Sequence, residues 1–288
     1  MWANRDWVGR WFPADTRPGD ELHAYRHWCN AVEGNTTFYG VPSARTVDRW
    51  RQQTPPTFRF AFKLPRTITH DRRLRDGGAE LADFCQRLAP LGERLGPTSV
   101  QLPASFAPGD LDVLDAFLGE LPRDRPWAVE VRHPAFSDGG PDERALNDLL
   151  HSHDVDRVLL DSRALFAGPD HTVAERETKR RKPRLPVRPV ATAHHPVVRF
   201  IGQTETGGNP AFWAPWLPKV ASWLAQGREP FFFLHTPDNV VALDLARRFR
   251  AEVAEQYRTL PPLGTERWEP ADVDQGDASG AAVEPTLW

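Results

Sequence analysis

The stretch VEGNTTFYGVPSARTVDRWRQQTPPTFRFAFKLPRTITH, from Val32 to His70, decides the fold class. Charged residues interrupt two of its segments that are otherwise patterned as buried strands. Side chains alternate between the two faces of a strand, so Glu33 and Asn35 share a face, and Lys63 points away from the preceding phenylalanines. In a closed parallel barrel the phenylalanines would pack against outer helices. Lys63 would then point into the barrel, near the opening at the carboxyl ends of the strands, which we call the mouth.

Strand-like and helix-like segments alternate along the chain, which predicts a parallel sheet. The strand-like segments are short and rich in aliphatic and aromatic residues, and the helix-like segments carry apolar residues at helical spacing. The predicted strands lie near residues 31–35, 58–64, 99–102, 128–133, 157–161, 197–201 and 231–235, and the predicted helices near 43–53, 79–89, 109–118, 142–151, 213–226 and 239–257.

The opening stretch resembles the core pattern of the DUF72 family, VE.N.TFY..P...T...W...TP..F.F..K.PR.ITH, a group of uncharacterised TIM-barrel-like proteins. The resemblance continues with WAVEVRHPAF from Trp127, PVVRFIG from Pro196 and FFFLHTPDN from Phe231, and it covers nearly the whole chain to about Tyr257. It implies an α/β, TIM-barrel-like (β/α)8 domain over residues 1–260. It implies no particular reaction, because the activity of the family is not established.

The resemblance also implies a strand that the other segments do not supply. The family carries a short strand and a glycine-containing turn before the position of Trp2, so we expect a barrel whose first strand is missing or truncated at the N-terminus. Either the true start lies upstream of Met1, which we favour, or the first and last strands leave a seam that exposes backbone donors and acceptors.

Composition narrows the class of protein. A chain of 288 residues with 40% apolar content can form one large α/β barrel. A net charge of -3 gives no overall electrostatic reason to expect nucleic acid or an anionic membrane. Cys29 and Cys85 are too few for a disulfide framework, and no apolar run approaches the roughly 18 residues of a membrane helix. We therefore expect a cytoplasmic protein without a membrane partner.

The candidate site consists of polar side chains at the carboxyl ends of the predicted strands. Glu130 and Arg132 share a face of their strand, which repeats the parity of Glu33 and Asn35. The predicted ring balances three acids, Glu33, Glu130 and Asp161, against three bases, Lys63, Arg132 and Arg199. Such a balance also fits a satisfied ion-pair network without catalysis, although desolvated charges at a mouth are typical of a functional site. We predict as catalytic Glu33, Lys63, Glu130 and Arg132, and as substrate-binding Asn35, Tyr39, His70, Gln101, His133, Asp161, Arg199 and His235.

Three mechanisms could use this ring, and no spacing selects among them. Lys63, with its pKa lowered by desolvation and nearby arginines, could form a Schiff base with a carbonyl substrate. Glu33 and Glu130 could instead form an acid–base pair while Lys63 and the arginines bind an anion. A divalent metal could be held by oxygen and imidazole ligands, namely Glu33, Glu130 and Asp161 with His133 or His235. The sequence thus predicts a lyase, isomerase or hydrolase acting on a small anionic or sugar-like substrate.

A different function follows from the basic loop and the tail. Residues 175–188, ERETKRRKPRLPVR, form a basic run whose prolines should keep it extended, and such a patch can bind a polyanion. Residues 261–288 have the composition of a disordered tail, and its end, Glu284 to Trp288, resembles short peptides that dock on bacterial sliding clamps. The alternative is a nucleic-acid-associated binding protein that uses this loop and the C-terminal tail, with the ring as scaffold only.

Overall fold

The strands form two parallel sheets that curl around a common interior. The computed structural model describes residues 2–257. One sheet has two strands in the order β1-β2, and the other has five in the order β3-β4-β5-β6-β7. Isolated parallel bridges, Phe60 to Leu95 and Lys63 to Ser99, connect β2 to the start of the larger sheet. The strands are β1 (Ala31–Gly34), β2 (Arg59–Phe62), β3 (Thr98–Gln101), β4 (Trp127–Glu130), β5 (Asp156–Asp161), β6 (Val197–Ile201) and β7 (Phe231–His235).

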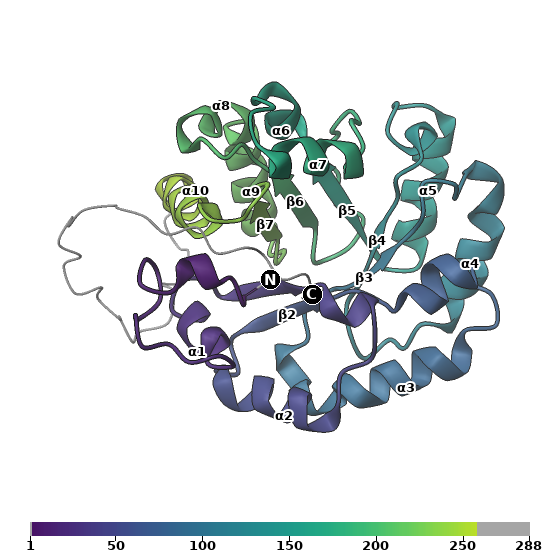
Figure 1. The fold of residues 1–288 in the computed structure, drawn as a ribbon. Coiled ribbons are helices and arrows are strands. Elements are labelled where there is room, and N and C mark those ends of the chain that lie inside the picture. The colour runs from purple at the N-terminus through teal and green to yellow at the C-terminus, as the bar shows by residue number, and fades with distance from the viewer. Residues whose placement is uncertain (1, 258–288) are drawn as a thin grey trace.

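All seven predicted strands are confirmed, each within three residues of its predicted bounds. The helices lie outside the curled strands (Figure 1). The predicted helix over 213–226 is wrong in one respect, because it is divided into α8 and α9, with Pro215 before the first residue of α9. The helices are α1 (Glu21–Tyr25), α2 (Ala44–Gln53), α3 (Gly78–Leu88), α4 (Leu111–Glu120), α5 (Pro141–Ser152), α6 (Arg163–Ala167), α7 (Val173–Arg181), α8 (Pro210–Trp213), α9 (Trp216–Ala225) and α10 (Ala242–Gln256).

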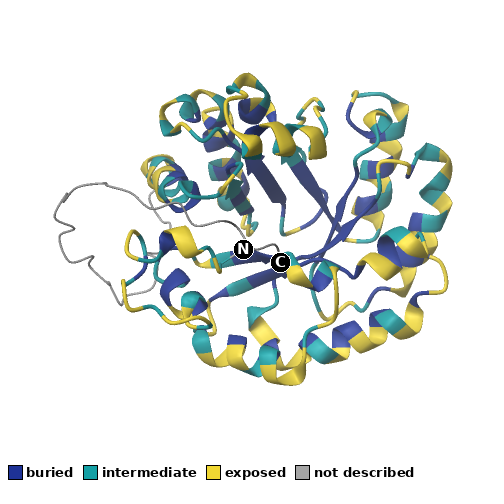
Figure 2. Cartoon of the chain, in the orientation of Figure 1, coloured by how far each residue is buried: buried dark blue, intermediate teal, exposed yellow. Residues whose placement is uncertain are grey.

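The two faces of the strands have different neighbours. On the outer face, Phe60 and Phe62 stack on Trp50 of α2, with ring centroids 6.0 and 5.4 Å away, which confirms the predicted role of the phenylalanine face. The strands are dark blue, and so buried, whereas the helices turn exposed residues outward (Figure 2). On the inner face a separate apolar cluster is formed by Ala61, Ala128, Val158, Val197, Phe231 and Phe233. These residues share strand parity with the polar residues at the carboxyl ends, so the polar site has an apolar floor.

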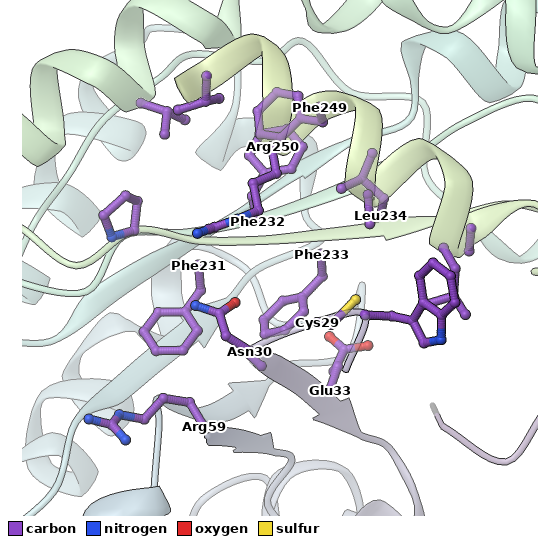
Figure 3. Close-up of a pocket in the computed structure, with 18 of the residues that line it drawn as sticks. Cys29, Asn30, Glu33, Arg59, Phe231, Phe232, Phe233, Leu234, Phe249 and Arg250 are labelled. Carbon is purple, nitrogen blue, oxygen red and sulfur yellow. The ribbon is translucent and has the colours of Figure 1, made fainter. Parts of the chain in front are cut away.

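A slot of about 470 Å³ lies between β1 and β7. Within residues 2–257, the ladder partner of β1 is β2 and that of β7 is β6, so the facing edges of β1 and β7 are not paired with each other. Figure 3 shows Phe231 and Phe233 directed from β7 toward Asn30 and Glu33. The seam is therefore open in the described residues.

Two expectations for the remaining segments have different outcomes. The basic run was expected to be extended, but its first half forms α7, which begins with a capping box between Thr172 and Glu175. The run is extended only from Lys182 onward, where Pro183 follows. The predicted disordered tail, residues 261–288, lies outside the described residues. From residue 2 to residue 257 there is no helix with the length and apolarity needed to cross a membrane.

Candidate functional site

A continuous chain of ion pairs joins three strands at the mouth. Glu130, at the end of β4, accepts hydrogen bonds from Arg132 at 3.0 and 2.9 Å on one oxygen and from Arg199 at 2.8 Å on the other. Arg199, from β6, also donates to Glu33 of β1 at 3.0 Å. Glu33, Glu130 and Arg199 are buried. The structure thus brings together residues 166 positions apart, as the strand parity predicts.

The two carboxylates of this chain are held in their ionised form. Burial would raise the pKa of Glu130, but Arg199 and Arg132 outweigh it and lower that pKa to about 2. Burial likewise acts against ionisation of Glu33, and Arg199 and Lys63 nevertheless hold its pKa well below the usual value. A general acid or base works best with a pKa near the working pH. The two glutamates are therefore poorly suited to the predicted acid–base pair.

Lys63 lies beside this chain on the inner face of β2. Its ammonium group donates a hydrogen bond to Gln101 at 2.9 Å, and both side chains are buried. Burial and the charge of Arg199 lower the pKa of Lys63, as the sequence predicts for a desolvated lysine near arginines. The backbone of Lys63 is fixed by Thr37, whose hydroxyl donates to the Lys63 carbonyl at 2.7 Å and accepts from its N–H at 3.2 Å.

Lys182, from the basic run that was expected to bind a polyanion, lies close enough to the site for its charge to interact with Arg199, Glu130 and Arg132. It follows the last residue of α7, and its backbone is extended, with φ -101° and ψ 136°. Burial, together with the charges of Arg199 and Arg132, lowers the pKa of Lys182 to about 8, although Glu130 opposes the shift. The signal that could have found it is Pro183, because a residue before proline leaves the helical path and turns its side chain away from the helix face.

Three more predicted residues lie at the mouth. His235 Nε2 lies 3.4 Å from a carboxylate oxygen of Glu33, and burial lowers the pKa of His235 to about 4, so it is neutral at pH 7. Asn35 donates to Glu33 at 3.1 Å. His70 contacts the hydroxyl of Thr69 at 2.9 Å, and burial followed by the charge of Arg132 lowers the pKa of His70.

Two predicted substrate-binding residues have other partners. Asp161 was expected in the ring, but it lies on the outer face, where it accepts hydrogen bonds from Arg163 at 2.7 Å and from the Trp216 indole at 2.8 Å. Helices α6 and α9 supply these partners, so Asp161 fastens helices to the sheet. His133 accepts a hydrogen bond from the N–H of Ala135 at 3.3 Å and so caps the short helical turn that begins at Pro134.

The predicted charge balance is wrong. Asp161 leaves the ring and Lys182 enters it, so four cations, Lys63, Arg132, Lys182 and Arg199, face two carboxylates, Glu33 and Glu130. The predicted metal ligands are not all brought together either, because His235 lies beside Glu33 whereas Asp161 and His133 have other partners. No group of three or more His, Cys, Asp or Glu side chains within residues 2–257 could hold a metal ion. The donor set for the metal alternative is therefore missing, and the surplus of positive charge favours an anion.

A family model described as "Protein of unknown function DUF72" matches residues 1–270. The chain belongs to the DUF72 family. It is similar to the UPF0759 protein YecE of Escherichia coli K12, with 41% identity over 265 residues, covering 92% of this chain and 93% of that protein. This match confirms the family that the core pattern predicts.

Two crystal structures of DUF72 family proteins have the same fold. The protein from Thermotoga maritima aligns with a TM-score of 0.66 and 23% identity, covering 87% of this chain and 95% of that one. The protein from Enterococcus faecalis aligns with a TM-score of 0.60 and 18% identity, covering 83% of this chain and 94% of that one. At such identities the likeness shows the fold alone.

The basic loop of this DUF72 protein is partly neutralised by its own chain. Lys179 donates to the Gly168 carbonyl at 2.8 Å and pairs with Asp170. Arg181 pairs with Glu177 at 3.2 Å. The positive patch is therefore weaker than its sequence suggests.

Proposed function

We propose that this DUF72 protein is an enzyme whose mouth binds a small anionic substrate and that Lys63 is its reactive group. The observation that carries the proposal is that four buried or half-buried cations face only two carboxylates. Each arginine has a glutamate partner, whereas neither lysine is within ion-pair distance of a carboxylate in the described part of the chain. A bound anion would relieve the repulsion among these groups.

The proposed roles follow from exposure and pKa. Arg132 keeps 21% of its side chain exposed, so it and Lys182 are the cations that an entering anion would meet. Lys63 has a lowered pKa, which raises the fraction of neutral amine that can attack a carbonyl carbon or remove a proton. Gln101 would orient the amine. These roles favour the Schiff-base alternative, and with it a lyase or isomerase, over the acid–base pair and the metal.

We also propose the finer architecture that this chemistry implies. The seven strands would belong to a TIM-barrel-like (β/α)8 arrangement, with the slot between β1 and β7 at the place of the eighth strand. The free thiols Cys29 and Cys85 suit a reducing cytoplasm, which is where we propose the enzyme works.

Reductive trapping tests the role of Lys63. The protein would be incubated with pyruvate or dihydroxyacetone phosphate, reduced with borohydride, and analysed by peptide mass mapping. The chain has only four lysines, Lys63, Lys179, Lys182 and Lys219, so the modified position can be read directly. We expect an adduct on Lys63 that is absent in Lys63→Arg and retained in Lys219→Arg. Equal modification of all four lysines would contradict the proposal.

The nucleic-acid alternative keeps one favourable observation. Arg180 is exposed at the end of α7, and Arg184 lies 5.7 Å from the ring of Phe166, an arrangement that could stack on a base. The clamp-like residues Glu284 to Trp288 lie outside the described residues, so they add no structural support. We rank this function second.

A further inference from the structure

Tyr39 is an exposed aromatic side chain at the rim of the mouth. Its exposed fraction is 84%, and among residues 2–257 the other exposed large hydrophobic side chains, Val41 and Val173, are aliphatic. A phenol ring with this exposure presents a flat apolar face to solvent. Such a face is suited to stack on a planar ring of a ligand.

The turn that carries Tyr39 is fixed to the candidate site. Thr37, two residues earlier, is hydrogen-bonded to both the carbonyl and the N–H of Lys63. Phe38 packs edge-on against Tyr39, with ring centroids 5.2 Å apart at 88°. The turn therefore holds the Tyr39 backbone in a fixed position relative to the proposed reactive lysine, so a ligand would have only the side chain to order.

The same turn also connects Tyr39, through Phe38, to His70 and the nearby Arg132. Phe38 also packs edge-on against His70, at 5.1 Å and 83°. The charge of Arg132 acts on His70, and Arg132 is partly exposed. One short turn thus carries an exposed aromatic side chain, a contact through Phe38 to His70, which is near the partly exposed Arg132, and the hydrogen bonds that fix the backbone of Lys63.

We propose that the substrate is an aromatic 2-oxo acid, whose carboxylate binds Arg132 and Lys182, whose carbonyl meets Lys63 and whose ring stacks on Tyr39. The inference rests on the proposed function, because it uses the same cations and the same lysine. In the covalent step the neutral amine of Lys63 forms a C=N bond to carbon 2 of the acid. The carbonyl oxygen leaves as water with the two hydrogens of the amine, so no oxidant or reductant is required.

The experiment compares phenylpyruvate with pyruvate, which differ by the aromatic ring alone. Affinity would be measured by calorimetry, and imine formation by borohydride trapping at Lys63. In the wild type we expect phenylpyruvate to bind about tenfold more tightly than pyruvate, from ring burial and stacking. Tyr39→Ala should remove most of this advantage, and Tyr39→Phe, which keeps the ring, should retain it.

The outcomes separate the two proposals. Trapping of pyruvate at Lys63 without an advantage for phenylpyruvate would overturn the aromatic subsite and leave the proposed function standing. Failure of both acids to bind or to be trapped would overturn both. Equal losses for pyruvate and phenylpyruvate in Tyr39→Ala, together with a lowered melting temperature, would show that Tyr39 is structural and would also overturn the inference.

Discussion

Buried charges lie on both faces of the curled strands, and the two groups differ in their balance of positive and negative charge. On the outer face the buried Arg157 of β5 pairs with Glu143 of α5 at 3.0 Å, and Asp161 pairs with Arg163 at 2.7 Å. The exposed Arg188 also lies 3.5 Å from Glu143. On the inner face four cations share two carboxylates. Balanced pairs fasten helices to strands, whereas a surplus is electrostatically costly unless something else binds there. Charge balance therefore distinguishes structural ion pairs from the candidate site better than burial does.

The largest expected effect is on the outer face. Arg157→Leu leaves Glu143 buried without its arginine on β5, and loss of one partner of a buried pair typically costs about 3–5 kcal/mol of the free energy of unfolding. Urea denaturation measures this loss. The double variant Glu143→Leu/Arg157→Leu is the matched control and should recover most of it. If Arg157→Leu lowered the free energy of unfolding by less than about 1 kcal/mol, the outer-face pair would not have the structural role assigned to it.

Asp156, at the amino end of β5, tests the cost of an unbalanced buried charge. Burial raises its pKa to about 7, and its nearest basic group is His195, with Nδ1 3.9 Å away and a pKa lowered by burial. The folded state therefore favours protonated Asp156. This contribution to stability is full below the unfolded pKa and is lost as the pH rises through about 7.

Asp156→Asn should remove this dependence. Relative to the wild type, the variant should gain on the order of 2 kcal/mol in free energy of unfolding between about pH 5 and about pH 8. Denaturation curves at several pH values measure the difference. A constant difference across this range would show that Asp156 has an ordinary pKa and would contradict the prediction.

Substitution of Lys182 should change anion affinity more than stability, the reverse of what is expected for Arg157. Lys182→Met removes a cation that lacks a carboxylate partner among the described residues, so the free energy of unfolding should change by less than about 1 kcal/mol. Affinity for inorganic phosphate should fall about tenfold, because one desolvated charge is lost. Calorimetry measures the affinity, and Lys219→Met is the control because Lys219 packs over Trp223 on α9.

The same residue predicts a pH dependence of anion binding. With a pKa of about 8, Lys182 loses its charge as the pH rises through that value, so phosphate affinity in the wild type should fall there. In Lys182→Met the fall should be absent. An identical pH profile in both proteins would assign the titration to another group.

The smallest effect is expected on α7. Arg180→Gln/Arg181→Gln removes exposed charges, one of them already paired with Glu177, so stability should change by less than about 0.5 kcal/mol. Anion affinity at the mouth should be unchanged. Gel-shift assays with single-stranded DNA test the second-ranked function: weakened binding in this variant, with trapping at Lys63 absent in the wild type, would reverse the ranking.

The sequence predicts the inner face well where each strand has one obviously apolar side. In β2 the phenylalanines settle the outer face and so place Lys63 inside. In β5 both sides carry apolar and charged residues, so parity could not decide the direction of Asp161, whose partner Trp216 lies 55 positions away. Lys182 was missed because its place depends on where α7 ends and on what covers the mouth. Pairing across such distances is not encoded in local periodicity.

Because of the slot between β1 and β7, the charges at the mouth also connect these two strands. The backbone ladder does not close the ring there, but Arg199 of β6 and His235 of β7 both reach Glu33 of β1 across the gap. These side-chain contacts hold β1 and β7 together where the described residues form no backbone ladder. A ligand that competes for Arg199 or Glu33 must also weaken these contacts. Binding at the mouth should therefore change the rate at which β1 and β7 exchange their amide protons.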